Sequence, residues 1–203
     1  MSGYPVVVEG TTLSAVIAGG GRVATRKALS LLEAGARVHI VAPLVTPVLE
    51  QTAARNHDLH ITRAPFAPEH FGSALLVVVA TDDPEANALI GAQARALGRL
   101  VNVVSAPDQG NCITPAVHRS GDITVAVTTG RVPSAAARIR DRLGRMLDTR
   151  YATAVRELTE LRANLLNRGE RDRWTTASTT LLGDEFCDHV ETGRFAARLA
   201  EWR

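Results

Sequence analysis

The chain has 203 residues, of which 45% are hydrophobic and 22% are charged. This length fits one larger domain with an appendage or two small domains, and the composition excludes disordered, collagen-like and mucin-like proteins. The 23 basic and 21 acidic side chains give a formal net charge of +2, which argues against binding to nucleic acid or to an anionic membrane surface.

The segment 13–104 predicts strands that alternate with helices. Leu13–Ala18 is a short apolar run that ends in three glycines, and apolar residues at helical spacing follow it as far as Leu32. Gly35 is suited to end this helix, and Arg37–Val41 is a second β-rich run. The alternation continues with a helical segment over 47–55, strands at His60–Thr62, Leu75–Ala80 and Leu100–Val104, and a helix over Pro84–Leu97. This order predicts a doubly wound parallel α/β sheet.

The pattern changes after Val104. The segment 105–116 is rich in turn-forming residues, and Asp122–Thr128 alternates as a half-exposed strand does. Helical spacing begins at Pro133 and is repeated in Tyr151–Leu166. We therefore expect a domain boundary near residue 113 and a helical last third.

The cysteines, the histidines and the N-terminus bear on compartment and metal binding. Cys112 and Cys187 are far apart and lie in no CxxC motif, which predicts neither a disulfide framework nor a zinc site. The six histidines show no ligand spacing, so no metal site is expected. No charged start precedes an apolar core, and no run reaches the length of a membrane span. We expect a soluble cytoplasmic protein.

The glycine turn carries the clearest chemical signal. Gly19-x-Gly21-x-x-Ala24 follows a predicted strand and opens a predicted helix, which is the context of a dinucleotide-binding fingerprint. The glycines permit a tight turn and close approach of a diphosphate, while Ala24 lets helix and strand pack closely. The anion would then rest on the helix N-terminus. A glycine-rich turn without a ligand is the alternative.

The ribose determinant of NAD-binding enzymes is missing. The second strand ends in Val41-Ala42-Pro43, where such enzymes usually carry an aspartate or glutamate. Arg22 is placed to pair with a 2′-phosphate, which keeps NADP open as the cofactor. A solvated arginine at the helix start is the alternative.

Five segments together resemble the precorrin-2 dehydrogenase / sirohydrochlorin ferrochelatase family: AGGGRVATRKALSLLEAGARVHIVAP, VVVATDDPEANALI, LVNVV, ITPAVHRSGDITVAVTTGRVPSAAARIRDRL and NRGERDRW. The resemblance implies a Rossmann-type NAD-binding domain over 1–113, a small α+β dimerisation region over 114–149 and a C-terminal helical region over 150–203. It implies a homodimer that oxidises precorrin-2 to sirohydrochlorin with NAD in sirohaem synthesis. Some family members also insert Fe²⁺, an activity that this sequence supports less well.

The family's binding residues carry over onto matching positions. The resemblance implies cofactor contacts from Gly19, Gly20, Gly21, Arg22, Val23, Ala24, Pro43, Leu44, Thr81, Asp82 and Asn102. It implies substrate contacts from Asn111, Pro115, Thr128 and Thr129. Capping of the helix at Pro84 is an alternative role for the segment 81–83, and the two threonines at 128–129 could simply end a strand.

Ser105 is the main departure from the family. The family typically reads NVVD, with the aspartate thought to serve catalysis, whereas this chain reads NVVS over 102–105. A serine hydroxyl accepts a proton poorly at neutral pH, because its pKa is far above that of a carboxyl group. Asp108 and His118 are the other catalytic candidates, although a turn aspartate and a surface histidine need no function. Arg22 and Thr114 also differ from the family's usual residues.

Three functions are therefore compatible with the sequence. The first is an NAD-dependent dehydrogenase acting on a polycarboxylate tetrapyrrole, and the arginine-rich composition suits such a substrate. The second is a related dehydrogenase with another small substrate in secondary metabolism, which the loss of the aspartate motivates. The third is a non-catalytic dimer that binds a tetrapyrrole or metal, or that senses NAD.

Overall fold

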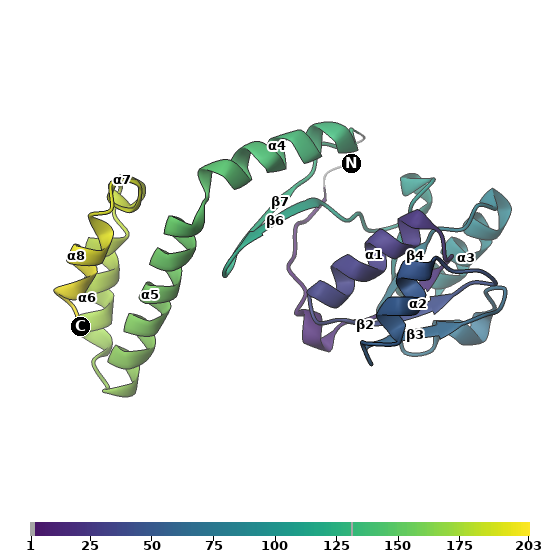
Figure 1. Ribbon diagram of the computed structural model, residues 1–203, viewed down its shortest axis with the longest axis horizontal. Helices are drawn as coiled ribbons and strands as arrows, with labels where there is room; N and C mark the ends of the chain where they lie inside the picture. Colours follow the sequence, from purple (N-terminus) through teal and green to yellow (C-terminus); the bar gives the residue numbers. More distant parts are fainter. Residues whose placement is uncertain (1–2, 131) are drawn as a thin grey trace. The chain divides into compact units, whose positions relative to one another are not determined.

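The computed structural model describes residues 3–130 and 132–203. The chain divides into two compact units, 1–114 and 115–203, which are treated separately below (Figure 1). The separation of the second unit into a dimerisation region over 114–149 and a helical region over 150–203 remains a prediction.

The first unit is built on a five-stranded parallel sheet with the strand order β3-β2-β1-β4-β5. The sheet confirms the doubly wound arrangement expected from the sequence, and β1 lies at its centre between β2 and β4. Ile17 of β1 pairs in register with Ile40 of β2 and Val78 of β4. The strands are β1 (Ser14–Ala18), β2 (Arg37–Val41), β3 (Leu59–Thr62), β4 (Leu76–Val79) and β5 (Leu100–Val103).

Helices cover both faces of this sheet (Figure 1). Ala24 and Ala28 of α1 and Leu49 of α2 are buried in the core on one face, whereas Ile90 and Ala94 of α3 are buried on the other. Full burial of a side chain as large as Leu49 contributes about 1.5–3 kcal/mol. The helical elements are α1 (Arg22–Glu33), α2 (Pro47–Ala53), α3 (Pro84–Ala96) and the short 3-10 turns η1 (Gly10–Thr12), η2 (Pro68–Phe71) and η3 (Pro107–Gln109).

Gly35 ends α1 as the sequence predicts. Its φ of 83° lies in the left-handed region, which a residue without a Cβ adopts freely. The Gly35 N–H donates to the Leu32 carbonyl at 2.9 Å, and the Ala36 N–H donates to the Leu31 carbonyl at 3.0 Å. This pair of bonds satisfies the last carbonyls of the helix and turns the chain into β2.

The second unit combines a β-hairpin with a series of helices. Strands β6 (Ala116–Ser120) and β7 (Ile123–Val127) pair antiparallel around Gly121, whose φ is 56°. The strand β7 was expected from its alternation, whereas β6 was not. Tyr151, Leu158 and Leu199 lie in the core that the last four helices share. The helices are α4 (Pro133–Met146), α5 (Thr149–Asn167), α6 (Arg171–Leu181), α7 (Phe186–Glu191) and α8 (Phe195–Ala200).

Both cysteines are free thiols, with Cys112 half-buried and Cys187 exposed. In the described part of the chain, no group of three or more histidine, cysteine or acidic side chains is arranged to hold a metal ion. None of the helices within residues 3–130 and 132–203 combines the length and the apolarity that a membrane span requires.

Three histidines gather on one face of the β2–β3 edge. The His39 ring lies 5.1 Å from the His60 ring and 6.1 Å from the His70 ring, measured between centroids. The His39 Nε2 shares a 2.8 Å hydrogen bond with the Thr62 hydroxyl. Burial, followed by the neighbouring charges of His60 and His70, lowers the pKa of His39. The cluster is therefore stable when His39 is neutral.

This cluster predicts a loss of stability in mild acid. Because the pKa of His39 in the folded chain lies below its ordinary value of 6.5, the unfolded chain takes up the proton first as pH falls. The contribution of neutral His39 to the free energy of unfolding is therefore fully present above pH 6.5 and decreases as the pH falls below it. We expect the free energy of unfolding in urea to fall less between pH 7 and pH 5 for His39→Gln than for the wild type. His57→Gln, at an exposed histidine outside the cluster, is the matched control and should behave as wild type.

Candidate nucleotide-binding site

The glycine turn between β1 and α1 is shaped by close backbone contacts. Gly19 has a φ of 118°, and a Cβ there would lie 2.3 Å from the Ala80 carbonyl oxygen. A Cβ at Gly20 would lie 2.1 Å from the Leu44 carbonyl oxygen. Since both distances are far below a van der Waals contact, only glycine permits the loops after β2 and β4 to approach this turn.

Gly21 has the opposite environment. It is the N-cap residue of α1, and a Cβ at this position would meet no atom within 4 Å. No side chain caps the helix, and no acidic residue lies in its first turn. The first N–H groups of α1, at the positive end of the helix dipole, therefore receive no cap from the side chain of the N-cap residue. These features fit the diphosphate of a dinucleotide.

The loop between β2 and α2 is fastened to the same turn. The Gly19 N–H donates to the Val41 carbonyl at 3.0 Å, and the Thr46 N–H donates to the Gly20 carbonyl at 3.1 Å. Thr46 also caps α2, and its hydroxyl lies 2.8 Å from that of Thr25 on α1. Leu44 is 83% exposed on this loop. An exposed apolar side chain beside a diphosphate site is suited to contact an adenine ring.

A second set of hydrogen bonds joins the loops that follow β4 and β5. The side chain of Asn87, on α3, is only 2% exposed. Its Oδ1 accepts from the Thr81 hydroxyl at 2.6 Å and from the Thr81 N–H at 3.2 Å. Its Nδ2 donates to the Thr81 carbonyl at 3.0 Å and to the Ser105 Oγ at 3.4 Å. Asn87 thus holds Thr81 and Ser105 at the same edge of the sheet.

The direction of these bonds assigns a role to the Ser105 hydroxyl. Because its oxygen accepts from Asn87, its own hydrogen remains free to donate. Ser105 is exposed at the end of β5. It can therefore donate a hydrogen bond to a ligand, whereas an aspartate, which the family resemblance implies at this position, could accept a proton there.

Two predicted site residues are engaged within the first unit itself. Asn102 is 6% exposed, and its Nδ2 donates to the Cys112 carbonyl at 3.2 Å. Its Oδ1 is buried and has no hydrogen-bond partner among the described residues. Asn111 accepts from the Val101 N–H at 2.6 Å and donates to the Arg99 carbonyl at 2.8 Å, so it extends the edge of β5.

The remaining candidates are placed as follows. Asp82 and Asp108 are exposed, and Asp108 lies in η3. Asp83 caps α3 by accepting from the Glu85 N–H at 2.9 Å and the Ala86 N–H at 3.1 Å, which is the capping role given as an alternative for this segment.

Four candidates belong to the second unit: Pro115, His118, Thr128 and Thr129. The His118 ring packs against α4 so closely that a Cβ at Gly144 would lie 2.7 Å from its Nδ1. Its Nε2 is buried without a hydrogen-bond partner in the described part of the chain. The Thr129 hydroxyl donates to the Val132 carbonyl at 2.6 Å. Their roles toward a ligand remain predictions.

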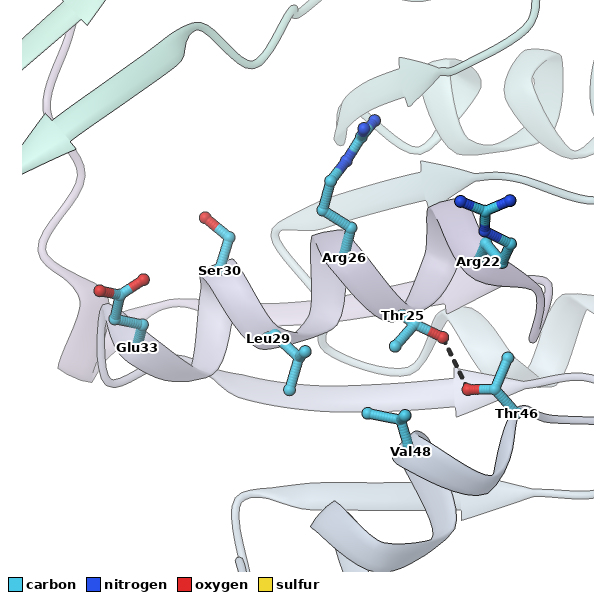
Figure 2. Close-up of a pocket in the computed structure, with 8 residues that line it drawn as sticks. All are labelled: Arg22, Thr25, Arg26, Leu29, Ser30, Glu33, Thr46 and Val48. Carbon is cyan, nitrogen blue, oxygen red and sulfur yellow. Dashed lines mark hydrogen bonds between the residues drawn. The ribbon is translucent and has the colours of Figure 1, made fainter. Parts of the chain in front are cut away.

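A pocket of about 570 Å³ lies on α1 beside the glycine turn (Figure 2). Figure 2 shows Arg22 and Arg26 projecting from the same side of α1, and the bond from Thr25 to Thr46 joining α1 to the start of α2. Of these residues only Arg22 was singled out from the sequence. Arg26 lies one helical turn further along, and this spacing was the available signal. Leu29, Ser30, Glu33 and Val48 complete the lining.

A parallel sheet of order 3-2-1-4-5 with a glycine turn at its central strand defines a Rossmann-type dinucleotide-binding protein. The turn lies where the strand order reverses, at the carboxyl ends of the strands. The NAD(P)-binding family model NAD_binding_7 matches residues 6–116. The chain belongs to this NAD(P)-binding family.

Similar proteins extend this result. The solved structure named "SirC, precorrin-2 dehydrogenase" has a TM-score of 0.78 and 27% identity, covering 98% of this chain and 99% of that one. "Siroheme synthase" of Chromobacterium violaceum is 34% identical over 99% of this chain and 43% of its own length. "Siroheme synthase 2" of Aeromonas hydrophila is 41% identical over 71% of this chain and 30% of its own length. The family resemblance drawn from the sequence is confirmed, and the chain spans less than half of these synthases.

Proposed function

We propose that this chain is an NAD(P)-dependent dehydrogenase that oxidises precorrin-2, as the name of the SirC structure states for that protein. The observation that carries the proposal is the likeness to SirC along nearly the whole of both chains, in an NAD(P)-binding protein. The open N-terminus of α1 behind Gly21 supports it, because the diphosphate of the cofactor fits there.

Different residues of the first unit bind different parts of the cofactor and the substrate. The N–H groups at the start of α1 hold the diphosphate, and Leu44 offers an apolar surface to the adenine. Bound NAD(P)⁺ supplies the hydride acceptor. Oxidation removes a hydride and a proton from the macrocycle, and the Ser105 hydroxyl donates a hydrogen bond that orients the substrate while water takes the proton.

The substrate, assembly and compartment complete the proposal. The substrate contacts that the family resemblance implies are Asn111, Pro115, Thr128 and Thr129, of which the Thr128 hydroxyl and the second Nδ2 hydrogen of Asn111 can donate to a carboxylate. Asp108 and His118 are further candidates for acid or base. We also propose a homodimer formed through β6, β7 and α4, where Ile139 and Met146 are exposed apolar side chains, and light scattering of the purified protein tests this. The free cysteines suit the reducing cytoplasm.

The proposal is tested with the purified chain, precorrin-2 and either NAD⁺ or NADP⁺. We expect the absorbance spectrum of sirohydrochlorin to develop together with one equivalent of reduced nicotinamide, and no change when the nucleotide is omitted. If the nucleotide binds and precorrin-2 remains unoxidised, the assignment of substrate is wrong. Another substrate or a sensing role would then replace it, while the nucleotide site would stand.

A further inference from the structure

The pocket in Figure 2 carries an unusual charge arrangement for a helix start. Arg22 and Arg26 line it, and neither forms a salt bridge to any described residue. Lys27 follows directly, and burial together with the Arg26 charge lowers its pKa. Glu33 is the acidic lining residue, three helical turns beyond Arg22. Three cations thus lie in the half of α1 where the helix dipole disfavours them.

The donors in this pocket can be counted. The Thr25 hydroxyl donates to the Gly21 carbonyl at 2.9 Å, and the Thr46 hydroxyl then donates to the Thr25 oxygen at 2.8 Å. Each threonine has a single hydroxyl hydrogen, so both are used within the protein. The guanidinium groups of Arg22 and Arg26 and the hydroxyl of Ser30 are therefore the side-chain donors left for a ligand, and the two arginines are the cationic ones. A guanidinium group binds a phosphate through paired hydrogen bonds.

The pocket adjoins the place where the adenosine ribose would lie. The loop after β2 contacts the glycine turn through the bond from the Thr46 N–H to the Gly20 carbonyl. That loop begins at Ala42-Pro43, without the carboxylate that accepts hydrogen bonds from the ribose hydroxyls of NAD. An arginine nearby is the usual partner of the 2′-phosphate in NADP.

We infer that Arg22 and Arg26 bind the 2′-phosphate of NADP and that the chain prefers NADP to NAD. The inference rests on the nucleotide site proposed above and names the cofactor that this site takes. The dianionic phosphate neutralises the two arginines, which accounts for their unfavourable position on the helix. NAD carries a neutral hydroxyl at this position, which makes weaker hydrogen bonds to the guanidinium groups than a phosphate does.

Calorimetric titration of the full chain tests the inference without any turnover. We expect NADP⁺ to bind at least about tenfold more tightly than NAD⁺, since charge-assisted bonds to phosphate are among the strongest in proteins. Adenosine 2′,5′-bisphosphate should likewise bind more tightly than adenosine 3′,5′-bisphosphate or inorganic phosphate. Arg26→Gln and Arg22→Gln should each reduce the ratio of the two dinucleotide affinities at least about fivefold.

The control and the contrary outcomes separate this inference from the proposed function. Arg55→Gln removes an exposed arginine that does not line the pocket, and it should leave the affinity ratio unchanged. Equal affinities for NAD⁺ and NADP⁺, or a ratio insensitive to both pocket arginines, would overturn the 2′-phosphate site and leave the dinucleotide site intact. If neither dinucleotide binds, the proposed function itself fails.

Discussion

Replacing Gly21 by aspartate is expected to abolish dinucleotide binding while leaving the protein folded and slightly more stable. The backbone of Gly21, with φ of −79° and ψ of −170°, suits any residue, and a Cβ there meets nothing within 4 Å. An aspartate at an N-cap position accepts hydrogen bonds from the first helical N–H groups, and its charge favours the helix dipole. We expect the free energy of unfolding to rise by about 0.5 kcal/mol.

The same change removes the site of the diphosphate in two ways. The carboxylate takes up the N–H groups that the phosphates would use, and it repels them at close range. Charge pairs at such distances near a protein surface interact by a few kcal/mol, so we expect NAD(P)⁺ to bind roughly 100-fold more weakly or not at all. Calorimetric titration measures the affinity, and urea unfolding measures the stability.

Gly21→Asn separates capping from charge. Asparagine caps a helix about as well as aspartate but does not repel phosphate. We expect an intermediate loss of affinity with a similar gain in stability. Unchanged nucleotide affinity in the aspartate variant would show that the diphosphate lies elsewhere, and the role assigned to the glycine turn would be lost.

The glycine turn could be predicted from the sequence because its determinants are local. The strand before Gly19, the tight turn and the helix that Gly35 closes follow one another within a short segment, so spacing alone indicates the geometry. The sheet could be predicted for a similar reason, since its strands are apolar on both faces and alternate with helices.

The contacts between loops could not be predicted in this way. Asn87 reads as a polar residue within a helix, and its bond to Ser105 exists only because β4 and β5 are neighbours in the sheet. The pocket likewise depends on α1 and the start of α2 lying side by side, which brings Thr25 to Thr46. The strand β6 was missed because its segment follows a turn-rich stretch and contains few apolar residues. Its strand conformation depends on pairing with β7.

Replacing Ser105 by aspartate is expected to raise the rate of precorrin-2 oxidation by a factor of about 10² to 10⁴, the usual contribution of a general base. The resemblance drawn from the sequence implies an aspartate at this position in the family. The exposed Ser105 oxygen accepts an N–H from Asn87 at 3.4 Å, and a carboxylate there can accept the same bond. The second carboxylate oxygen is then available to take the proton that leaves the macrocycle.

Ser105→Asn is the matched control for this gain. Asparagine has nearly the shape of aspartate but cannot accept a proton from the substrate, so its rate should not exceed that of the wild type. The rate is followed by the absorbance of the reduced nicotinamide, and the affinities of the variants for NAD(P)⁺ should agree with that of the wild type. Equal rates for serine, asparagine and aspartate would show that a carboxylate at position 105 does not take the proton, and Asp108 in η3 would be the next residue to replace. A gain confined to the aspartate variant would instead show that a carboxylate at the end of β5 can act as the base for this reaction.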